Sequence, residues 1–280
     1  MTGINRAVLI AAVLLLAVCA NGFGCVGARP LAMGGAFVGL ADDANATYWN
    51  PAGLARFDSP KVTAMYTATN RDEINYLGYL AYGGRLTRGG AGYGFSYISS
   101  QTMPGKYGVD DQSWFWMSGA FRASKDTTVG VNVRFVNDSI SGLSTQTALD
   151  LSFLRVVDEK WSFGLLIQDI NEPRIEDDGH AIATHGRNIR PGIAYRYDRN
   201  TIVTADIYDL LDHSGVQALR VGVERILPSG VAVRTGYYGT GGSGGLTFGV
   251  GSRFGRMSVD AALMTGDLDN TLLVSASSKY

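Results

Sequence analysis

Short segments in which apolar and polar side chains alternate recur along the chain from about residue 60 to its end. In the clearest of them, apolar residues stand at every second position from Val129 to Phe135, with glycine or polar residues between them. Successive side chains of a β-strand point to opposite faces, so a period of two indicates a strand with one apolar face. The chain is therefore expected to be all-β, with a second face of glycine, small polar groups and single charges.

About fourteen such segments can be counted, each close to the 9–11 residues that a tilted membrane-crossing strand requires. Their expected spans are 61–69, 74–85, 89–99, 112–123, 126–137, 145–155, 160–170, 189–197, 200–210, 217–226, 230–238, 245–255, 256–265 and 270–280. A closed antiparallel barrel is the only sheet that lipid tolerates, because an open edge would leave backbone groups unpaired. The alternative is a soluble β-sandwich, which also alternates but seldom has fourteen near-equal strands.

The connections between these segments differ in length in a regular way. Those around Thr87, Ser124, Asp198, Pro228 and Gly255 are short, whereas 100–111 and 171–188 are long. Outer-membrane barrels have short periplasmic turns and longer outer loops. An even number of strands with both termini in the periplasm places every long connection outside.

Composition supports a sheet that faces lipid. Charged residues make up 18% of the chain, against about 25% in soluble domains, and 37 of the 280 residues are glycine. Aromatic residues near expected strand ends are candidates for interfacial girdles: Tyr82, Tyr97, Trp114, Trp161, Tyr197, Tyr237 and Tyr280. The formal net charge of −1 leaves no electrostatic footprint for nucleic acid.

The N-terminus predicts export. Arg6 precedes an apolar run from Ala7 to Ala20, shorter than the about 20 residues of a membrane-spanning helix. A basic start, a short apolar core and a small-residue end at Val18-Cys19-Ala20 describe a cleaved signal peptide over residues 1–20. We expect an outer-membrane location, because a barrel exported in this way can still span that membrane.

Residues 21–58 are not strand-like, and we expect them to form a small plug inside a barrel of residues 59–280. Gly34-Gly35 interrupts any regular element. Asp42-Asp43 can cap a short helix over 44–49, and Pro51 can open a second turn. We expect Asp42, Asp43 and Asn50 to face lumen arginines such as Arg220 and Arg234.

Three blocks in this segment carry a family resemblance: 34–37 (Gly-Gly-Ala-Phe), 41–44 (Ala-Asp-Asp-Ala) and 49–54 (Trp-Asn-Pro-Ala-Gly-Leu). They resemble the N-terminal region of the FadL/TodX outer-membrane transporter superfamily, and most closely its PorV/PorQ-like branch. The resemblance implies a fourteen-stranded barrel with an N-terminal hatch that contains the candidate site residues Gly34, Gly35, Asp42, Asp43, Trp49, Asn50, Pro51 and Ala52. The chain differs from FadL-type channels, which have large outer loops, because only two of its expected loops exceed about ten residues.

The resemblance implies passive transport of hydrophobic small molecules through a plugged barrel. The short loops favour two alternatives: a PorV-like barrel that docks exported proteins at the cell surface, and a structural outer-membrane barrel. Its expected partners are outer-membrane lipid, the barrel-assembly machinery, and either a hydrophobic ligand or an exported protein.

The barrel interior is expected to hold the charged side chains Arg134, Asp150, Arg190, Asp206, Arg220, Glu224, Arg234, Arg253 and Asp260. They form either a balanced network that anchors the plug or a cluster that binds a ligand carboxylate. Arg134, Arg220, Arg234 and Arg253 are the candidate ligand or plug contacts. We expect substitutions on this face, such as Gly249→Ser and Asn132→Arg, to be better tolerated than charge on the lipid face.

We expect that the protein is not an enzyme and that it binds no cofactor or metal ion. His180, His185 and His213 match no zinc motif, and no Gly-x-Ser-x-Gly elbow or phosphate-binding loop is present.

Overall fold

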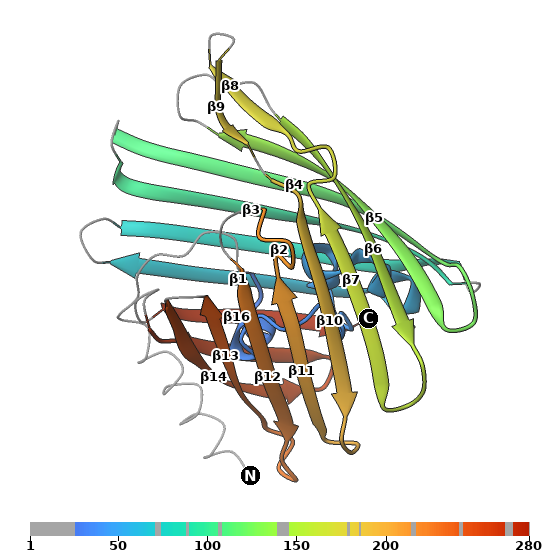
Figure 1. Ribbon diagram of the computed structural model, residues 1–280. Helices are drawn as coiled ribbons and strands as arrows, with labels where there is room; N and C mark the ends of the chain where they lie inside the picture. The colour runs from blue at the N-terminus through green and yellow to red at the C-terminus, as the bar shows by residue number, and fades with distance from the viewer. Residues whose placement is uncertain are drawn as a thin grey trace.

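The computed structural model describes residues 26–280 except 71–73, 88–89, 106–107, 139–145, 178–179, 185, 214–216, 241–242, 267–270 and 280. In this part of the chain fourteen strands form one closed antiparallel barrel (Figure 1). Each strand pairs with its neighbour in sequence, β7 pairs with β10, and β1 closes the barrel against β16. The predicted all-β barrel and its strand number are confirmed.

The barrel strands agree closely with the expected spans. They are β1 Lys61–Asn70, β2 Ile74–Thr87, β3 Ala91–Gly105, β4 Gly108–Arg122, β5 Thr127–Asp138, β6 Gln146–Val156, β7 Trp161–Gln168, β10 Asn188–Arg196, β11 Thr201–Tyr208, β12 Ala218–Ile226, β13 Ala232–Thr240, β14 Ser243–Phe254, β15 Met257–Met264 and β16 Thr271–Lys279. Two further strands, β8 Arg174–Asp177 and β9 His180–Thr184, form a separate hairpin that projects at the top of Figure 1.

Two expected loops contain strand instead. The connection expected over 100–111 is a continuation of β3 and β4, whose pairing runs from Ser100↔Gln112 to Gly105↔Gly108 with one irregularity. The loop expected over 171–188 holds the β8–β9 hairpin. The first prediction was wrong because polar residues hide the strand signal there while backbone pairing continues. The second was wrong because β8 and β9, of four and five residues, are too short to show a period of two.

The predicted faces of the strands are confirmed. Val131 is 48% exposed on the outer surface and Phe248 46%, whereas Asn132 is 1% exposed and points inward. Trp114 departs from the expected girdle, because it lies on the inward face of β4 beside the buried Trp116. The barrel thus presents apolar side chains outward and encloses small and polar ones.

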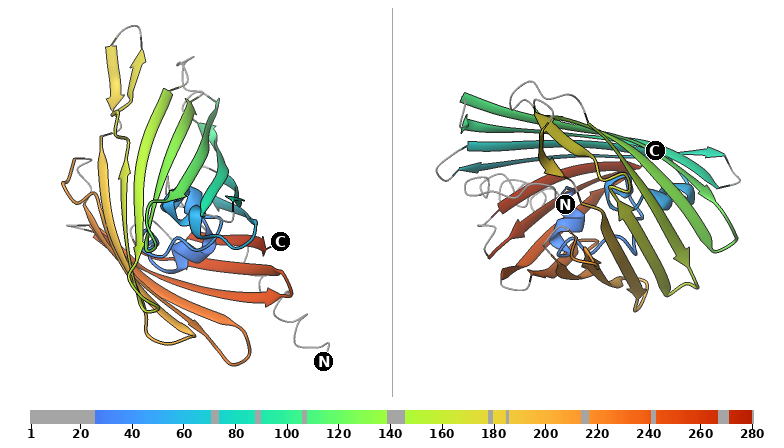
Figure 2. Two further views of the ribbon diagram at one scale, coloured as in Figure 1. Left: turned by 90° about the vertical axis from the view of Figure 1, so that its right-hand side faces the viewer. Right: turned by 45° about the horizontal axis from the view of Figure 1, so that its top comes forward.

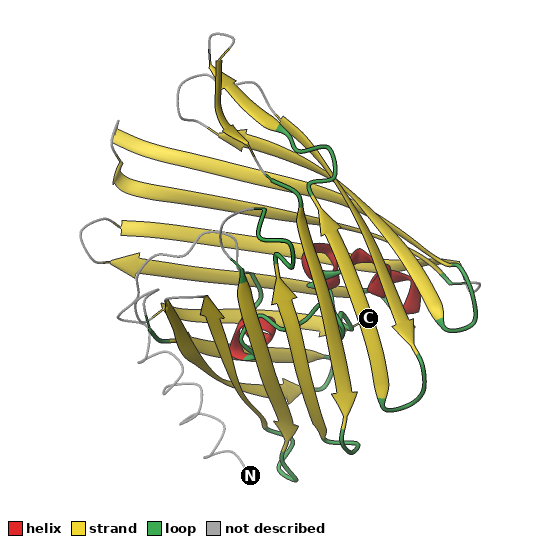
Figure 3. Cartoon of the chain, in the orientation of Figure 1, coloured by secondary structure: helices red, strands yellow, loops and turns green. Residues whose placement is uncertain are grey.

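Residues 26–57, which we call the inner segment, lie inside the barrel (Figures 2 and 3). The segment contains the helices α2 Ala28–Ala32 and α3 Ala46–Trp49 and the 3₁₀ helix η1 Pro51–Arg56. Nearly all of its side chains are buried. No helix in the described part of the chain is long and apolar enough to cross a membrane.

Glycine occupies nine wall positions at which the inner segment approaches closely, and we call these positions the glycine belt. At each of them a Cβ would lie less than 3.0 Å from an atom of the inner segment. The belt consists of Gly83, Gly92, Gly94, Gly130, Gly164, Gly192, Gly222, Gly236 and Gly249. The expectation that Gly249→Ser is tolerated was therefore wrong, since its Cβ would stand 2.3 Å from that of Ala32.

Candidate functional site

Asn50 connects the inner segment to itself and to the barrel wall. Its side-chain Oδ1 accepts the Ala52 N–H at 3.1 Å, which caps η1, and Pro51 begins that helix as predicted. Its Nδ2 donates to the carbonyl of Val38 at 2.8 Å and to that of Phe153, in β6, at 3.0 Å. Asn50 is fully buried, so every one of these bonds forms without competition from water.

Gly34 and Gly35 form a turn that only glycine adopts readily, with φ of 66° and 74°. A Cβ on Gly34 would lie 2.4 Å from the carbonyl oxygen of Tyr237 in β13. Thr247 of β14 holds the same turn, because its hydroxyl donates to Ala32 O and accepts the Gly34 N–H, both at 3.0 Å. The glycine pair therefore lets the backbone lie directly against the wall.

Asp42 and Asp43 bind Arg29 rather than the lumen arginines. Arg29 Nη1 lies 2.6 Å from an Asp42 oxygen and 2.9 Å from an Asp43 oxygen. The expectation that they face Arg220 and Arg234 was wrong, because Arg29, in α2, lies nearer and is the partner of both. The predicted N-cap of the short helix was also wrong, because Asn45, and not Asp42 or Asp43, precedes α3. Asp43 Oδ1 instead accepts the Asn45 N–H at 2.9 Å.

Arg29 also links the inner segment to the barrel wall. Its Nε and Nη2 donate to the two oxygens of Glu224 in β12, at 2.8 and 2.9 Å. Glu224 also accepts from Arg234 at 2.6 Å, and Arg234 donates to Asp260 at 2.7 Å. We call Asp42, Asp43, Arg29, Glu224, Arg234 and Asp260 the charge network. Burial lowers the pKa of Arg29, but Asp42, Glu224 and Asp43 outweigh it and raise that pKa well above its usual value.

Polar wall side chains also satisfy the backbone of the inner segment. Asp206 in β11 accepts the N–H groups of Phe37 and Val38 at 2.7 and 2.8 Å. Asn132 donates to Thr47 O at 3.0 Å, and Ser162 donates to Gly39 O at 2.7 Å. The sequence pattern placed Asp206 and Asn132 in the lumen but did not identify their partners. The expected tolerance of Asn132→Arg was wrong, because Asn132 is 1% exposed and its amide holds the Thr47 carbonyl, so a longer side chain would displace the inner segment.

The four candidate arginines do not form one cluster. Arg134 pairs with Asp169 and lies over the rings of Trp114 and Trp116, at 5.3 and 5.8 Å from their centroids. Arg220 contacts Trp49 of the inner segment, 5.7 Å from its ring centroid. Arg234 belongs to the charge network, and Arg253 is exposed at the mouth of the barrel. The arrangement supports the balanced interior network and not a single carboxylate-binding cluster.

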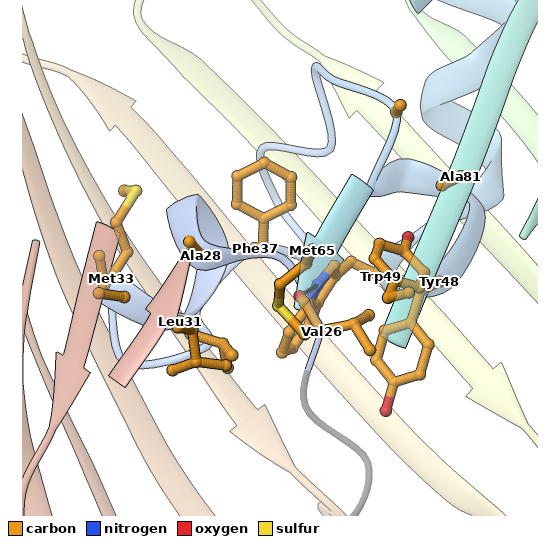
Figure 4. Close-up of a cluster of buried hydrophobic side chains, with 14 of the residues drawn as sticks. Val26, Ala28, Leu31, Met33, Phe37, Tyr48, Trp49, Met65 and Ala81 are labelled. Carbon is orange, nitrogen blue, oxygen red and sulfur yellow. Dashed lines mark hydrogen bonds between the residues drawn. The ribbon is translucent and has the colours of Figure 1, made fainter. Parts of the chain in front are cut away.

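A chain of aromatic rings crosses the interior from the inner segment to β4. Phe37 meets Trp49 at 6.5 Å, Trp49 meets Tyr48 at 5.2 Å, Tyr48 meets Trp116 at 5.6 Å, and Trp116 meets Trp114 at 5.8 Å. These distances join ring centroids, and in all four pairs the edge of one ring meets the face of the other. Aromatic pairs favour this geometry. Met65, Val26 and Leu31 belong to the same buried apolar cluster (Figure 4). We call the five rings the aromatic chain; they are Phe37, Trp49, Tyr48, Trp116 and Trp114. Together with the apolar cluster they form a continuous aromatic and aliphatic region in the interior.

A cavity of about 960 Å³ with many charged and serine residues in its lining, which we call the vestibule, lies at the end of the barrel that carries the short turns. It is lined by members of the charge network and by residues at the β12–β13 and β14–β15 turns. No sequence pattern indicated it. Within the described residues, no group of three or more metal-ligating side chains gathers; the predicted loop residue His185 lies outside that part.

No protein-family model matches the chain, and no curated protein matches its sequence at a significant level. Solved structures do match. The CymD monoaromatic hydrocarbon channel aligns with a TM-score of 0.73 at 12% identity, over 91% of this chain and 97% of that one. The Pseudomonas putida toluene transporter TodX aligns with 0.68 at 11%, over 94% and 99%. A Pseudomonas aeruginosa FadL homologue aligns with 0.61 at 11%, over 94% and 99%.

The chain has the FadL/TodX fold. The resemblance predicted from residues 34–54 is thereby confirmed at the level of the fold, over nearly the whole length of each matched channel. The fold encloses the inner segment and the aromatic chain in one barrel, with the vestibule at the end that carries the short turns.

Proposed function

We propose that the protein is an outer-membrane channel for the passive passage of hydrophobic small molecules, with the inner segment as its plug. The observation that carries this proposal is the aromatic chain, which joins plug residues to the wall of a FadL/TodX-type barrel. A porin for hydrophilic solutes needs a water-filled polar lumen. Here a buried aromatic and aliphatic cluster lies between the plug and the wall, so a hydrophobic permeant can pass where these side chains move apart.

The outer surface supports the membrane location. Large apolar side chains such as Val131, Phe163 and Phe248 are exposed around the barrel, and a soluble protein seldom exposes so continuous an apolar surface. In a membrane they contact lipid. The short turns and the vestibule then face the periplasm, and the β8–β9 hairpin faces outward.

The proposal assigns residues 1–20 to a signal peptide, 21–58 to the plug and 59–280 to the barrel; residues 1–25 lie outside the described part. Gly34, Gly35, Asn50, Pro51 and Ala52 shape the plug and seat it on the wall. Asp42 and Asp43 hold it through Arg29, and Trp49 contributes to the aromatic chain. The protein is not an enzyme in this proposal, and the barrel-assembly machinery inserts it.

The test is uptake by Gram-negative cells that produce the protein. Cells with the protein should take up a radiolabelled alkylbenzene several-fold faster than cells without it, while uptake of a charged sugar phosphate stays unchanged. Trp116→Ala should alter the alkylbenzene rate, whereas Trp161→Ala, which changes an outward tryptophan, should not. Equal stimulation of both solutes would indicate a porin, and no stimulation would refute the channel. A stoichiometric exported protein that copurifies from cells without stimulated uptake would instead support the docking alternative.

A further inference from the structure

The vestibule has an excess of positive charge. Its lining contains seven basic and four acidic side chains. The basic ones are Arg29, Lys61, Arg196, Arg234, Arg253, Arg256 and Lys279, and the acidic ones are Asp42, Asp43, Glu224 and Asp260. The acids are largely used within the charge network, so the excess lies with the remaining cations.

The remaining cations differ in whether they already form hydrogen bonds or ion pairs. Lys61 donates to the backbone carbonyl of Asp42 at 2.7 Å, and Lys279 pairs with Asp58 at 2.7 Å. Arg196 reaches an Asp42 oxygen only at 3.7 Å. Arg253 and Arg256, beside the β14–β15 turn, have no ion pair in the described part of the chain, and both are exposed. Two guanidinium groups are therefore available at the mouth of the cavity.

Hydroxyl groups stand beside these arginines in a row across three strands. Arg253 in β14 is paired in register with Ser258 in β15, and Ser258 with Ser277 in β16. All three residues line the vestibule. Ser277 continues the row by donating to Thr63 of β1 at 2.8 Å, and Thr63 is buried inside the barrel. Because Ser277 donates its hydrogen to Thr63, the hydroxyl of Ser258 is the neutral donor that the row supplies next to Arg253.

We propose that the vestibule binds a phosphate group, held by Arg253 and Arg256 with the Ser258 hydroxyl as a further donor. A guanidinium presents paired N–H groups that match phosphate oxygens, and a phosphate has enough oxygens to use serine hydroxyls as well. Its negative charge offsets the excess positive charge of the lining. The cavity volume falls in the range of small-molecule sites, roughly 300–1,000 Å³, so it accommodates a phosphate ester as well as the bare ion. The ester is either the headgroup of a membrane phospholipid or a free periplasmic metabolite.

The proposal is tested by calorimetric titration of the purified protein in a non-ionic detergent. The probes are inorganic phosphate, a short-chain phosphatidic acid below its micelle concentration, and acetate. The variant R253Q/R256Q removes the two free guanidinium groups. The matched control, R199Q/R225Q, removes two exposed arginines near the same end that do not line the vestibule. The heat-dependent shift of the folded barrel on a gel verifies that both variants are assembled.

We expect R253Q/R256Q to weaken phosphate binding at least tenfold and R199Q/R225Q to leave it unchanged. Binding of phosphatidic acid alone identifies a lipid headgroup as the source, and comparable binding of inorganic phosphate identifies a free phosphate. The proposal fails if neither phosphate probe binds, if R253Q/R256Q binds as the parent protein does, or if acetate binds as tightly as phosphate.

Discussion

At the scale of single residues, the glycine belt shows how a barrel wall accepts a second chain segment against its backbone. Gly164 is the tightest position, since a Cβ there would lie 2.0 Å from the Val38 carbonyl oxygen. Gly119 in β4 is the contrasting case, because the nearest atom to its Cβ would be 3.8 Å away, in Val131. Both are strand glycines, but only one of them is required by a close approach.

Gly164→Ala should therefore destabilise the protein and Gly119→Ala should not. A buried methyl group without space displaces the inner segment, and such overpacking costs typically 1–3 kcal/mol, that is about 2 kcal/mol here. Denaturant unfolding in detergent, followed by tryptophan fluorescence, measures the difference. Equal midpoints for the two variants would show that the segment does not rest on the wall at Val38.

Asn50→Ala tests the hydrogen bonds at the junction of α3 and η1. The variant leaves two buried carbonyls and the Ala52 N–H with fewer partners, at about 1–3 kcal/mol for each group left unpaired. We expect a lower unfolding midpoint and, under the proposed function, a changed rate of alkylbenzene uptake. Asn200→Ala, in the exposed β10–β11 turn, is the control and should change neither quantity. An unchanged midpoint in Asn50→Ala would mean that water replaces the lost donors.

At the scale of elements, α2 and η1 are held in different ways. Contacts of η1 are with β2 to β6, where the wall offers glycines and Ser152; α2 contacts β13 to β16, with Arg29 joined to Glu224 in β12. The η1 end thus depends on close backbone packing, which salt does not weaken. The α2 end depends on charges that line a vestibule, where water and ions reach them.

Arg29→Gln should loosen the α2 end. The variant leaves Asp43 without its cation, Asp42 with only Arg196 at 3.7 Å, and Glu224 with only Arg234. Loss of one partner of a buried ion pair costs about 3–5 kcal/mol, and we expect about 2 kcal/mol because Arg29 is partly solvated and Arg234 remains. Adding Glu224→Gln should cost less than the sum of the two single changes. Additive costs would show that the two side chains are not coupled.

Asp58 and Lys279 join the start of β1 to the end of β16 at the surface. The hydrogen bond from Lys279 is the main cause that lowers the pKa of the Asp58 carboxyl. Because the folded-state pKa is depressed, the pair stabilises the fold above the ordinary carboxyl pKa of about 4, and this contribution is lost as the pH falls through the lower folded value. Asp58→Asn should therefore lower the unfolding midpoint slightly at pH 7 and not at pH 2. The effect should vanish in 1 M salt, and a larger effect at pH 2 would contradict this assignment.

Much of this element-scale organisation could not be predicted from the sequence. Alternation and segment length identified the barrel strands, and local turn residues identified the start of η1 at Pro51. The partner of Asp42 was missed although Arg29 is only 13 residues away, because no local pattern shows which arginine a carboxylate will face. The Arg29–Glu224 pair spans 195 residues of sequence and depends on the closed barrel, so only the structure could reveal it.

At the scale of the whole molecule, the outward apolar surface determines where the barrel can reside. Under the proposed function, Val131→Arg places a charge in the lipid-facing surface and should cost roughly 2–4 kcal/mol near the membrane centre. Tyr197→Arg, in an exposed turn, should cost little. The fraction of protein that migrates as the compact, unheated form on a gel measures both. Equal assembly of the two variants, or a parent chain soluble without detergent, would contradict the membrane location.

The pairing of β1 with β16 sets an order of events during biogenesis. The first strand closes against the last, so the ring cannot be completed until the final residues of the chain have been made. The inner segment immediately precedes β1 and fills the space that this closure encloses. We expect it to enter before β1 and β16 pair, because the open sheet gives it free access to the wall positions that it contacts. Contacts of such long sequence separation form slowly, so we expect the step from open sheet to closed ring to be slow.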